Sequence, residues 1–165
     1  MLIIVMGLPG SGKSFFAQKL AENLGMAYLN SDVIRKEIRM QGQYQPAQKW
    51  VVYEKMAEKA RGFLQMKKSV IVDATFQFME SRELFKDLSG EFGQDLVCFY
   101  IWAVEPLITE RLSHERQDSE ADFEVYRLVK MDYAAIPSHC HSIQSTNENI
   151  NDMINKAKIH LKPNQ

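Results

Sequence analysis

The chain has 165 residues, of which 45% are hydrophobic and 25% are charged, and its formal net charge at pH 7 is −1. Such a chain is long enough for one domain with a hydrophobic core, and its composition excludes a disordered or fibrous protein. The near-neutral charge provides no general attraction to nucleic acid or to a membrane surface. Because no apolar run approaches the ~20 residues of a membrane span and none resembles a signal peptide, we expect one domain over residues 1–165, in the cytoplasm and without a membrane partner.

A glycine-rich run at residues 7–14, GLPGSGKS, fits the phosphate-binding pattern G-x-x-x-x-G-K-[ST]. The apolar segment at residues 2–6 predicts a strand before it, and apolar residues at helical spacing predict a helix after it that ends at Gly25. Strand, loop and helix is the context that this motif requires. In such a loop the backbone N–H groups surround the phosphates, Lys13 reaches the β- and γ-phosphates, and Ser14 ligates Mg²⁺.

The rest of the chain alternates segments of strand type with segments of helix type. Strands are expected at residues 26–30, 70–73, 96–103 and 138–144, and helices at 32–40, 47–66, 80–88, 106–116, 121–135 and from 145 onward. Alternation of this kind predicts a parallel sheet with helices on both faces. The three continuously apolar strands belong in its centre, and the two polar strands belong at its edges. We therefore predict an α/β fold of the P-loop NTPase type with a five-stranded parallel sheet.

Two helix starts carry capping patterns. Ser31 or Asp32 is expected to cap the helix at residues 32–40. Ser145 and Glu148 form a capping-box pattern, which predicts that the last helix begins there.

The two cysteines, Cys98 and Cys140, have neither the number nor the spacing of a disulfide framework or a zinc site. Cys98 lies inside the apolar run at residues 96–103. Buried cysteines in such runs behave as small hydrophobic residues. The sequence therefore predicts that Cys98 is a free thiol in the core.

Ligands of parallel sheets bind beyond the carboxyl ends of the strands, so residues that follow the strands are candidates for a site. Asp32 and Arg35 follow the second strand and share one face of a helical turn. Asp32 can accept the proton of an attacking hydroxyl, and Arg35 can hold an anionic acceptor or the transferred phosphoryl group. Asp73 ends the third strand, where a carboxylate can hold Mg²⁺ through water. The alternative for Asp32 and Arg35 is a helix cap and a surface charge. The alternative for Asp73 is a turn residue at the end of its strand.

Arginines later in the chain leave several interpretations open. Arg82 either binds phosphate or is a solvated helix residue. Arg111 and Arg116 precede a polar stretch, which predicts a lid over about residues 112–124; an exposed helix end is the alternative. Arg116 lies nearer this lid, so we expect it to neutralise charge on the transferred phosphoryl group. Asn147, after the last strand, is expected to contact adenine.

Together these features resemble the small P-loop kinases related to polynucleotide kinases and zeta toxins, in particular their "predicted kinase" branch. The matching segments read GLPGSGKS at residues 7–14, SDVIR at 31–35 and VIVDATF at 70–76, followed by Arg111 and Arg116. The resemblance covers nearly the whole chain. It implies strand order 2-3-1-4-5, ATP and Mg²⁺ as cofactors, and a lid. It also implies that Asp32 activates the acceptor and that Arg35 lies on the acceptor side.

The expected site has three parts. The catalytic residues are Lys13, Asp32, Arg35 and Arg116. Ser14 and Asp73 hold the metal. The residues expected to bind ATP are Gly7, Pro9, Gly10, Ser11, Gly12, Lys13, Ser14, Phe15, Arg111 and Asn147.

These features predict an ATP-dependent kinase that transfers the γ-phosphoryl group to a hydroxyl of a small-molecule or nucleotide-like acceptor. A 5′-hydroxyl polynucleotide kinase is the first alternative, although the near-neutral charge argues mildly against a nucleic-acid partner. A non-catalytic nucleotide-binding module is the second, and the carboxylates at Asp32 and Asp73 argue against it. A GTPase is disfavoured because no N-K-x-D motif is present. We expect a monomer or a weak dimer.

Overall fold

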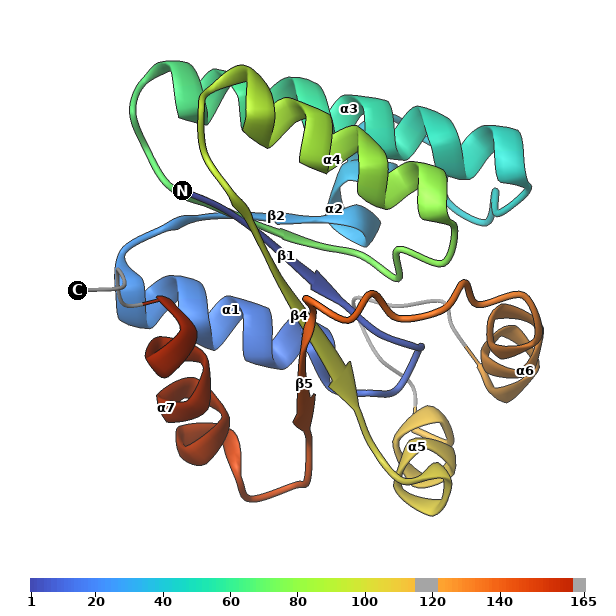
Figure 1. Ribbon diagram of the computed structural model, residues 1–165. Coiled ribbons are helices and arrows are strands. Elements are labelled where there is room, and N and C mark those ends of the chain that lie inside the picture. The colour runs from blue at the N-terminus through green and yellow to red at the C-terminus, as the bar shows by residue number, and fades with distance from the viewer. Residues whose placement is uncertain (115–121, 162–165) are drawn as a thin grey trace.

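The computed structural model describes residues 1–114 and 122–161. Its centre is one sheet of five parallel strands in the order β2-β3-β1-β4-β5, which confirms the predicted fold class and strand order (Figure 1). The strands are β1 Leu2–Met6, β2 Ala27–Asn30, β3 Val70–Asp73, β4 Leu96–Trp102 and β5 His141–Gln144. In the register of the sheet, Asp73 lies beside both Val5 and Asn30. The carboxyl ends of β1, β2 and β3 are therefore neighbours.

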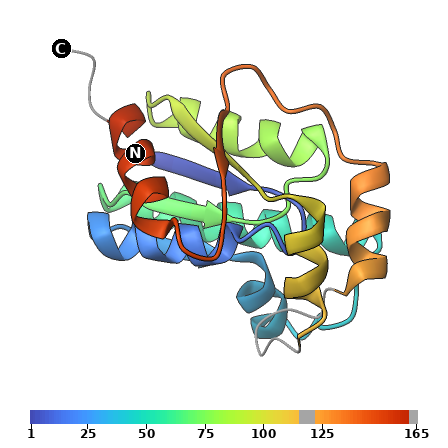
Figure 2. The same ribbon diagram turned by 90° about the horizontal axis from the view of Figure 1, so that it is seen from below.

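Helices cover both faces of the sheet (Figures 1 and 2). One face carries α1 Lys13–Leu24 and α7 Ile150–Leu161, and the other carries α3 Pro46–Gln65 and α4 Met79–Glu91. The short helix α2 Ser31–Glu37 packs against α3, while α5 Glu105–Leu112 and α6 Phe123–Met131 lie beyond the carboxyl end of the sheet. None of the helices in the described residues combines the length and apolar character that crossing a membrane requires.

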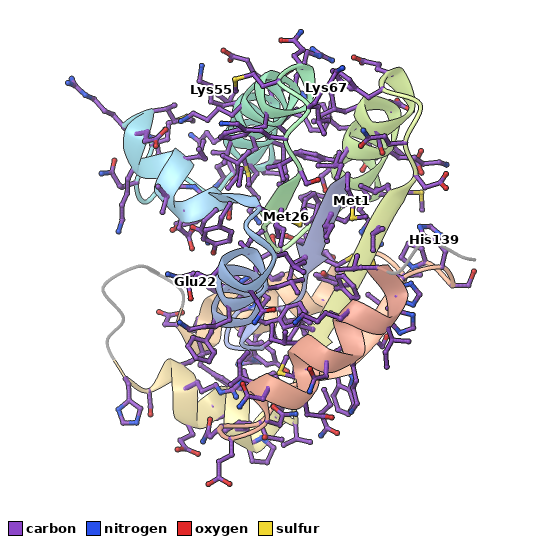
Figure 3. The ribbon with its side chains drawn as sticks, turned by 90° about the vertical axis from the view of Figure 1, so that its left-hand side faces the viewer. Met1, Glu22, Met26, Lys55, Lys67 and His139 are labelled. Atoms are coloured by element: carbon purple, nitrogen blue, oxygen red, sulfur yellow. A yellow bond between two sulfur atoms is a disulfide. The ribbon has the colours of Figure 1, made fainter. Side chains whose placement is uncertain are left out.

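The central strand shows why the core has two halves. Side chains alternate along a strand, so successive residues of β1 face opposite sides of the sheet. Leu2, Ile4 and Met6 pack with residues of α3 and α4, whereas Ile3 and Val5 pack with residues of α1 and α7. All five β1 side chains are buried, as expected for a central parallel strand. Figure 3 looks onto the amino ends of the strands, opposite the end where the site described below lies.

The capping predictions were wrong at both helix starts. Asn30 caps α2, and its side-chain oxygen accepts hydrogen bonds from the backbone N–H of Asp32 at 2.9 Å and of Val33 at 3.1 Å. The last helix begins at Ile150, five residues later than expected from the capping-box pattern. Ser145 lies too far from this start to cap the helix, and its hydroxyl accepts a hydrogen bond from Arg111.

Two other helices are shorter than the sequence pattern indicated. The helix expected over residues 106–116 ends at Leu112, and the helix expected over 121–135 covers Phe123–Met131. The lid expected over 112–124 includes residues 115–121, which lie outside the described residues.

The cysteines form a disulfide, so the prediction of a free core thiol was wrong. Cys98 on β4 is bonded to Cys140, which immediately precedes β5 and lies 42 residues later in the chain. Because β4 and β5 are neighbouring strands with Phe99 opposite His141, the preceding residues are also brought together. Pairing across strands is decided by the fold and does not follow from the spacing of two cysteines.

Candidate active site

The loop between β1 and α1 has a positive φ at Gly7, Gly10 and Gly12, and at two of these a side chain would also collide with neighbouring atoms. Gly12 has a φ of +88°, and a Cβ there would lie 2.6 Å from the Ser145 hydroxyl. Gly7 has a φ of +156°, and a Cβ there would lie 2.4 Å from the carbonyl oxygen of Ile101. The glycines thus allow the loop to pass close to β4 and to the loop after β5. Helix α1 begins at Lys13, so the positive end of its dipole lies where the glycine-rich loop ends.

Two cavities meet at the first turn of α1. The large cavity, of about 710 Å³, extends toward α2 and α3. The small cavity, of about 320 Å³, extends toward α5 and α7. Lys13, Ser14 and Phe15 line both cavities. The end of the glycine-rich loop is therefore the boundary between two spaces.

Arg111 closes one side of the small cavity. Its guanidinium donates hydrogen bonds to the carbonyl oxygen of Gly10 at 3.2 Å and to the Ser145 hydroxyl at 3.1 Å. It also donates two hydrogen bonds to Asn147 Oδ1, each at 3.3 Å. The structure therefore brings Arg111 and Asn147, both expected to bind ATP, together with the glycine-rich loop. A planar guanidinium in this position can stack against a base.

The remaining residues expected to bind ATP divide into two groups. Gly10 and Phe15 line both cavities, Gly12 lines the small one, and Pro9 lines the large one. Gly7 and Ser11 line neither of these cavities. Ser11 is buried, and its backbone N–H donates to the Leu8 carbonyl oxygen at 3.1 Å, so it shapes the loop from inside.

Asp73 lies beneath the loop and is fully buried. Its Oδ2 accepts a hydrogen bond from the Tyr28 hydroxyl at 2.8 Å and another from Asn30 Nδ2 at 2.6 Å, whereas its Oδ1 has no hydrogen-bond partner among the described residues. Asn30 Nδ2 also lies 3.5 Å from Ser14 Oγ, so Asn30 stands between Asp73 and Ser14. Burial, together with the neighbouring Asp73, raises the pKa of Tyr28 above its usual value.

The oxygen atoms of Ser14 and Asp73 suit a magnesium ion. Mg²⁺ prefers oxygen ligands and usually keeps several of its waters. Ser14 lines both cavities. The buried Asp73 Oδ1 is an acceptor without a partner among the described residues, as a carboxylate that binds a metal-held water would be. Asp73 itself lines neither cavity, so it fits a role through water better than direct ligation.

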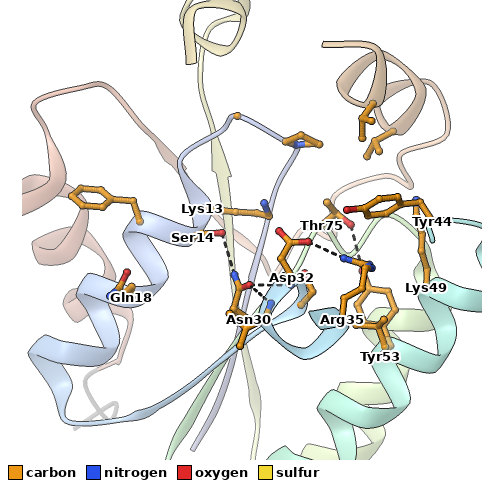
Figure 4. A pocket seen from close by; sticks show the side chains of 18 of the residues that line it. Lys13, Ser14, Gln18, Asn30, Asp32, Arg35, Tyr44, Lys49, Tyr53 and Thr75 are labelled. Carbon is orange, nitrogen blue, oxygen red and sulfur yellow. Dashed lines mark hydrogen bonds and ion pairs between the residues drawn. The ribbon is translucent and has the colours of Figure 1, made fainter. Parts of the chain in front are cut away.

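The opposite wall of the large cavity carries the predicted pair Asp32 and Arg35 (Figure 4). The two side chains form an ion pair of 2.8 Å. Arg35 is only 7% exposed, and its guanidinium lies 4.5 Å from the centre of the Tyr44 ring. The side chain of Arg35 is therefore held between a carboxylate and an aromatic face.

Lys49, one turn before Tyr53 on α3, extends this wall and was missed by the sequence analysis. Its ammonium group donates a hydrogen bond to Gln77 Oε1 at 2.9 Å. Burial, and secondarily the positive charge of Arg35, lower the pKa of Lys49 below its usual value. Tyr53 also lines the large cavity, and its hydroxyl accepts a hydrogen bond from the backbone N–H of Phe76 at 2.9 Å. The only sequence signal for Lys49 was its spacing of four residues from Tyr53, which places both on one helix face.

Arg82 has neither of the roles considered for it. It is 5% exposed, and its guanidinium donates to the carbonyl oxygens of Phe76, Ala134 and Ala135 at 2.9, 3.0 and 2.6 Å. It thus anchors the segment between α6 and β5 and contacts neither cavity. The other expected catalytic arginine, Arg116, lies outside the described residues.

A family model described as an AAA domain matches residues 2–136. The chain belongs to this AAA domain family. It is a small P-loop kinase-like protein, as the sequence resemblance implied. This AAA domain chain is 26% identical over 106 residues to the bifunctional polynucleotide phosphatase/kinase of Schizosaccharomyces pombe, a match that covers 64% of the chain and 22% of that relative. The chain spans about a quarter or less of the length of the curated relatives that it matches.

Solved structures share the fold of this AAA domain protein at low sequence identity. A gluconokinase from Sinorhizobium meliloti superposes with a TM-score of 0.75 at 17% identity, covering 96% of this chain and 90% of that one. Chaetomium thermophilum Kti12 in complex with ADP-AlF3 superposes with a TM-score of 0.74 at 14% identity, covering 99% and 100%. At these identities the likeness establishes the shared fold.

Proposed function

We propose that the chain is an ATP-dependent kinase that transfers the γ-phosphoryl group to a hydroxyl of a small molecule. One observation carries the proposal. Lys13 and Ser14 stand at the boundary of two cavities, one bordered by Arg111 and Asn147 and the other containing Asp32. A donor in the first and an acceptor in the second would meet at the end of the glycine-rich loop.

The small cavity takes the nucleotide base in this proposal. Arg111 and Asn147 border the base, the loop N–H groups bind the phosphates, and Lys13 binds the β- and γ-phosphates. Ser14, and Asp73 through water, would hold Mg²⁺, which would neutralise charge on the phosphates. Asn30 orients Asp73 through the hydrogen bond from its side-chain amide.

The large cavity takes the acceptor. Asp32 accepts the proton of the acceptor hydroxyl as the hydroxyl oxygen forms a bond to the γ-phosphorus. The bond between that phosphorus and the oxygen bridging it to the β-phosphate breaks, and ADP leaves. Arg35 holds Asp32 in place by their ion pair. We further propose that residues 112–124 form a lid over the phosphates and that Arg116 acts from it.

The names of the similar proteins support a kinase, and they point to different acceptors. One similar protein is a polynucleotide phosphatase/kinase, and another is a gluconokinase. A 5′-hydroxyl polynucleotide kinase is the second candidate, favoured by the first of these. We favour a small acceptor because the net charge of −1 provides no general attraction to a nucleic acid strand.

A transfer screen with radiolabelled ATP tests the proposal. The acceptors are nucleosides, sugars, sugar acids, aminoglycosides and oligonucleotides with a 5′-hydroxyl, each with the wild-type chain and with Lys13→Ala. We expect transfer to at least one small acceptor and a loss of several orders of magnitude in Lys13→Ala, which should stay folded because Lys13 lines both cavities and is not part of the buried core. Binding of ATP without transfer to any of these acceptors would instead favour a non-catalytic module. Transfer to oligonucleotides alone would favour a polynucleotide kinase.

A further inference from the structure

We propose that the small acceptor carries an anionic group, a carboxylate or a phosphate, which Arg35 and Lys49 bind in the large cavity; the inference rests on the proposed kinase function. The argument starts from the charges of the cavity wall. Among residues 1–114 and 122–161, three cationic side chains, Lys13, Arg35 and Lys49, line the cavity against one carboxylate, that of Asp32. Lys13 is committed to the phosphates of ATP, and Asp32 is paired with Arg35. One positive charge therefore remains on the acceptor side.

Lys49 carries this uncompensated charge. Its hydrogen-bond acceptor is the neutral amide of Gln77, at 2.9 Å, and its ammonium group lies 5.7 Å from the centre of the Phe78 ring. No carboxylate of a described residue forms an ion pair with it. A half-buried ammonium without an anionic partner is unusual, because burying a charge is costly unless the charge is paired.

Arg35 supplies the second observation, independent of the first. Its side chain is more than nine-tenths buried, and its Nε has no hydrogen-bond partner among the described residues. A buried donor left unsatisfied costs free energy, which a bound acceptor atom recovers. Tyr44 stacks against the guanidinium at 4.5 Å and limits its movement, so the group is positioned before any ligand arrives.

The positive charge of Arg35 also acts on Lys49. Burial and the nearby Arg35 lower the pKa of Lys49, so its charge is less stable in the folded protein than in water. An anion between the two side chains would offset both the burial of the Lys49 charge and its repulsion from Arg35. Because Arg35 touches Asp32 at 2.8 Å, the anionic group would lie close to the hydroxyl that Asp32 activates. The arrangement thus selects small hydroxy acids or phosphorylated alcohols over neutral alcohols.

Calorimetry with matched probes tests the anion site without requiring phosphoryl transfer. The P-loop is first saturated with a non-hydrolysable ATP analogue and Mg²⁺, so that it cannot bind the probe. The probes are inorganic phosphate and two matched sets: glycerol with glycerate and glycerol 3-phosphate, and sorbitol with gluconate. We expect the acidic members to bind about 10- to 100-fold more tightly than their neutral counterparts, the range for hydrogen bonds to charged groups.

Three variants locate the effect. Lys49→Gln should lose most of the preference for acidic probes, and Lys49→Arg should keep it. The matched control is Lys55→Gln on the same helix, since Lys55 pairs with Glu58 on the outer surface (Figure 3) and should bind the probes as the wild type does. Affinity for the ATP analogue should be equal in all four proteins, and thermal unfolding should show that each is folded.

Equal binding of acidic and neutral probes, or an unchanged preference in Lys49→Gln, would overturn the anion site. If a 5′-hydroxyl oligonucleotide bound as tightly as the small acidic probes, the acceptor would be a polynucleotide instead. These outcomes are independent of the kinase proposal. Charge preference without phosphoryl transfer would contradict the kinase function alone, and transfer without charge preference would contradict the anion site alone.

Discussion

Asp32 is the residue at which nucleotide binding and phosphoryl transfer should separate. It lines the large cavity, whereas the nucleotide base is proposed to lie in the small one. Its side chain does not cap α2, because Asn30 does, and it pairs instead with Arg35. Asp32 therefore faces the large cavity, and its side chain is not the cap of α2.

Asp32→Asn should reduce transfer by about 10²–10⁴-fold, the usual contribution of a general base. Affinity for ATP should change little, since Asp32 lines only the large cavity. The temperature of unfolding should fall, because the amide cannot form the ion pair with the buried Arg35. Steady-state transfer to the acceptor found by the screen, with calorimetry of ATP binding, measures both. Near wild-type transfer would remove Asp32 from the mechanism, and the proton acceptor would then have to be sought elsewhere.

At the scale of the elements, Asn30 joins three parts of the fold. It ends β2, caps α2, and connects Asp73 on β3 to Ser14 on α1 through its side-chain amide. The Asn30 side chain therefore positions the helix that bears Asp32, and it also positions the two residues proposed to hold the metal.

Substitutions at Asn30 should separate these tasks. Asn30→Ala loses the cap and should destabilise the protein by about 1 kcal/mol. Asn30→Ser keeps a capping oxygen but cannot donate to Asp73, so it should be more stable than Asn30→Ala. Both variants should require more Mg²⁺ for half-maximal transfer. Chemical denaturation and Mg²⁺ titrations test this, and a wild-type Mg²⁺ requirement in Asn30→Ser would show that Asn30 serves only as a cap.

At the scale of the whole molecule, the edge next to β5 has two features that bear on stability. The disulfide ties Cys98 on β4 to Cys140 before β5. On the outer strand, His141 stacks on His160 of α7 with ring centres 3.7 Å apart. Both features attach the last strand and helix to the rest of the sheet.

Breaking the disulfide should lower stability because the cross-link restricts the unfolded chain. For a closed loop of this length the expected loss is about 2–4 kcal/mol. The wild-type protein should therefore unfold at a lower temperature in reducing buffer, and a Cys98→Ala, Cys140→Ala double variant should unfold at the same temperature with or without reductant. Equal sensitivity of both proteins to the reductant would contradict this prediction.

The histidine pair should make stability depend on pH. Burial, followed by the charges of His160 and His139, lowers the pKa of His141 in the folded protein. The unfolded state, with a pKa of about 6.5, then binds more protons near that pH, so stability is full above it and falls as pH decreases. Denaturation between about pH 5 and 8 should show this slope. His141→Gln should flatten it, whereas the exposed control His114→Gln should not; an unchanged slope in His141→Gln would refute the assignment.

The sequence by itself determined the fold class, the strand order implied by its resemblance, and most of the residues proposed to line the nucleotide site. These features are local: the glycine-rich run, the apolar strands and the residues that follow them are read along the chain. Asp32 and Arg35 were recognisable as a pair because they lie one helical turn apart, and Asp73 because it ends an apolar strand.

Only the tertiary structure decided the features that depend on distant residues. Cys98 and Cys140 bond because two parallel strands place them side by side, and Arg82 turns inward because the segment after α6 presents carbonyl oxygens to it. Lys49 looks like any surface lysine in the sequence, and it lines the cavity because α3 packs beside α2. Local patterns predict which elements form, whereas the contacts between elements depend on how those elements pack in three dimensions.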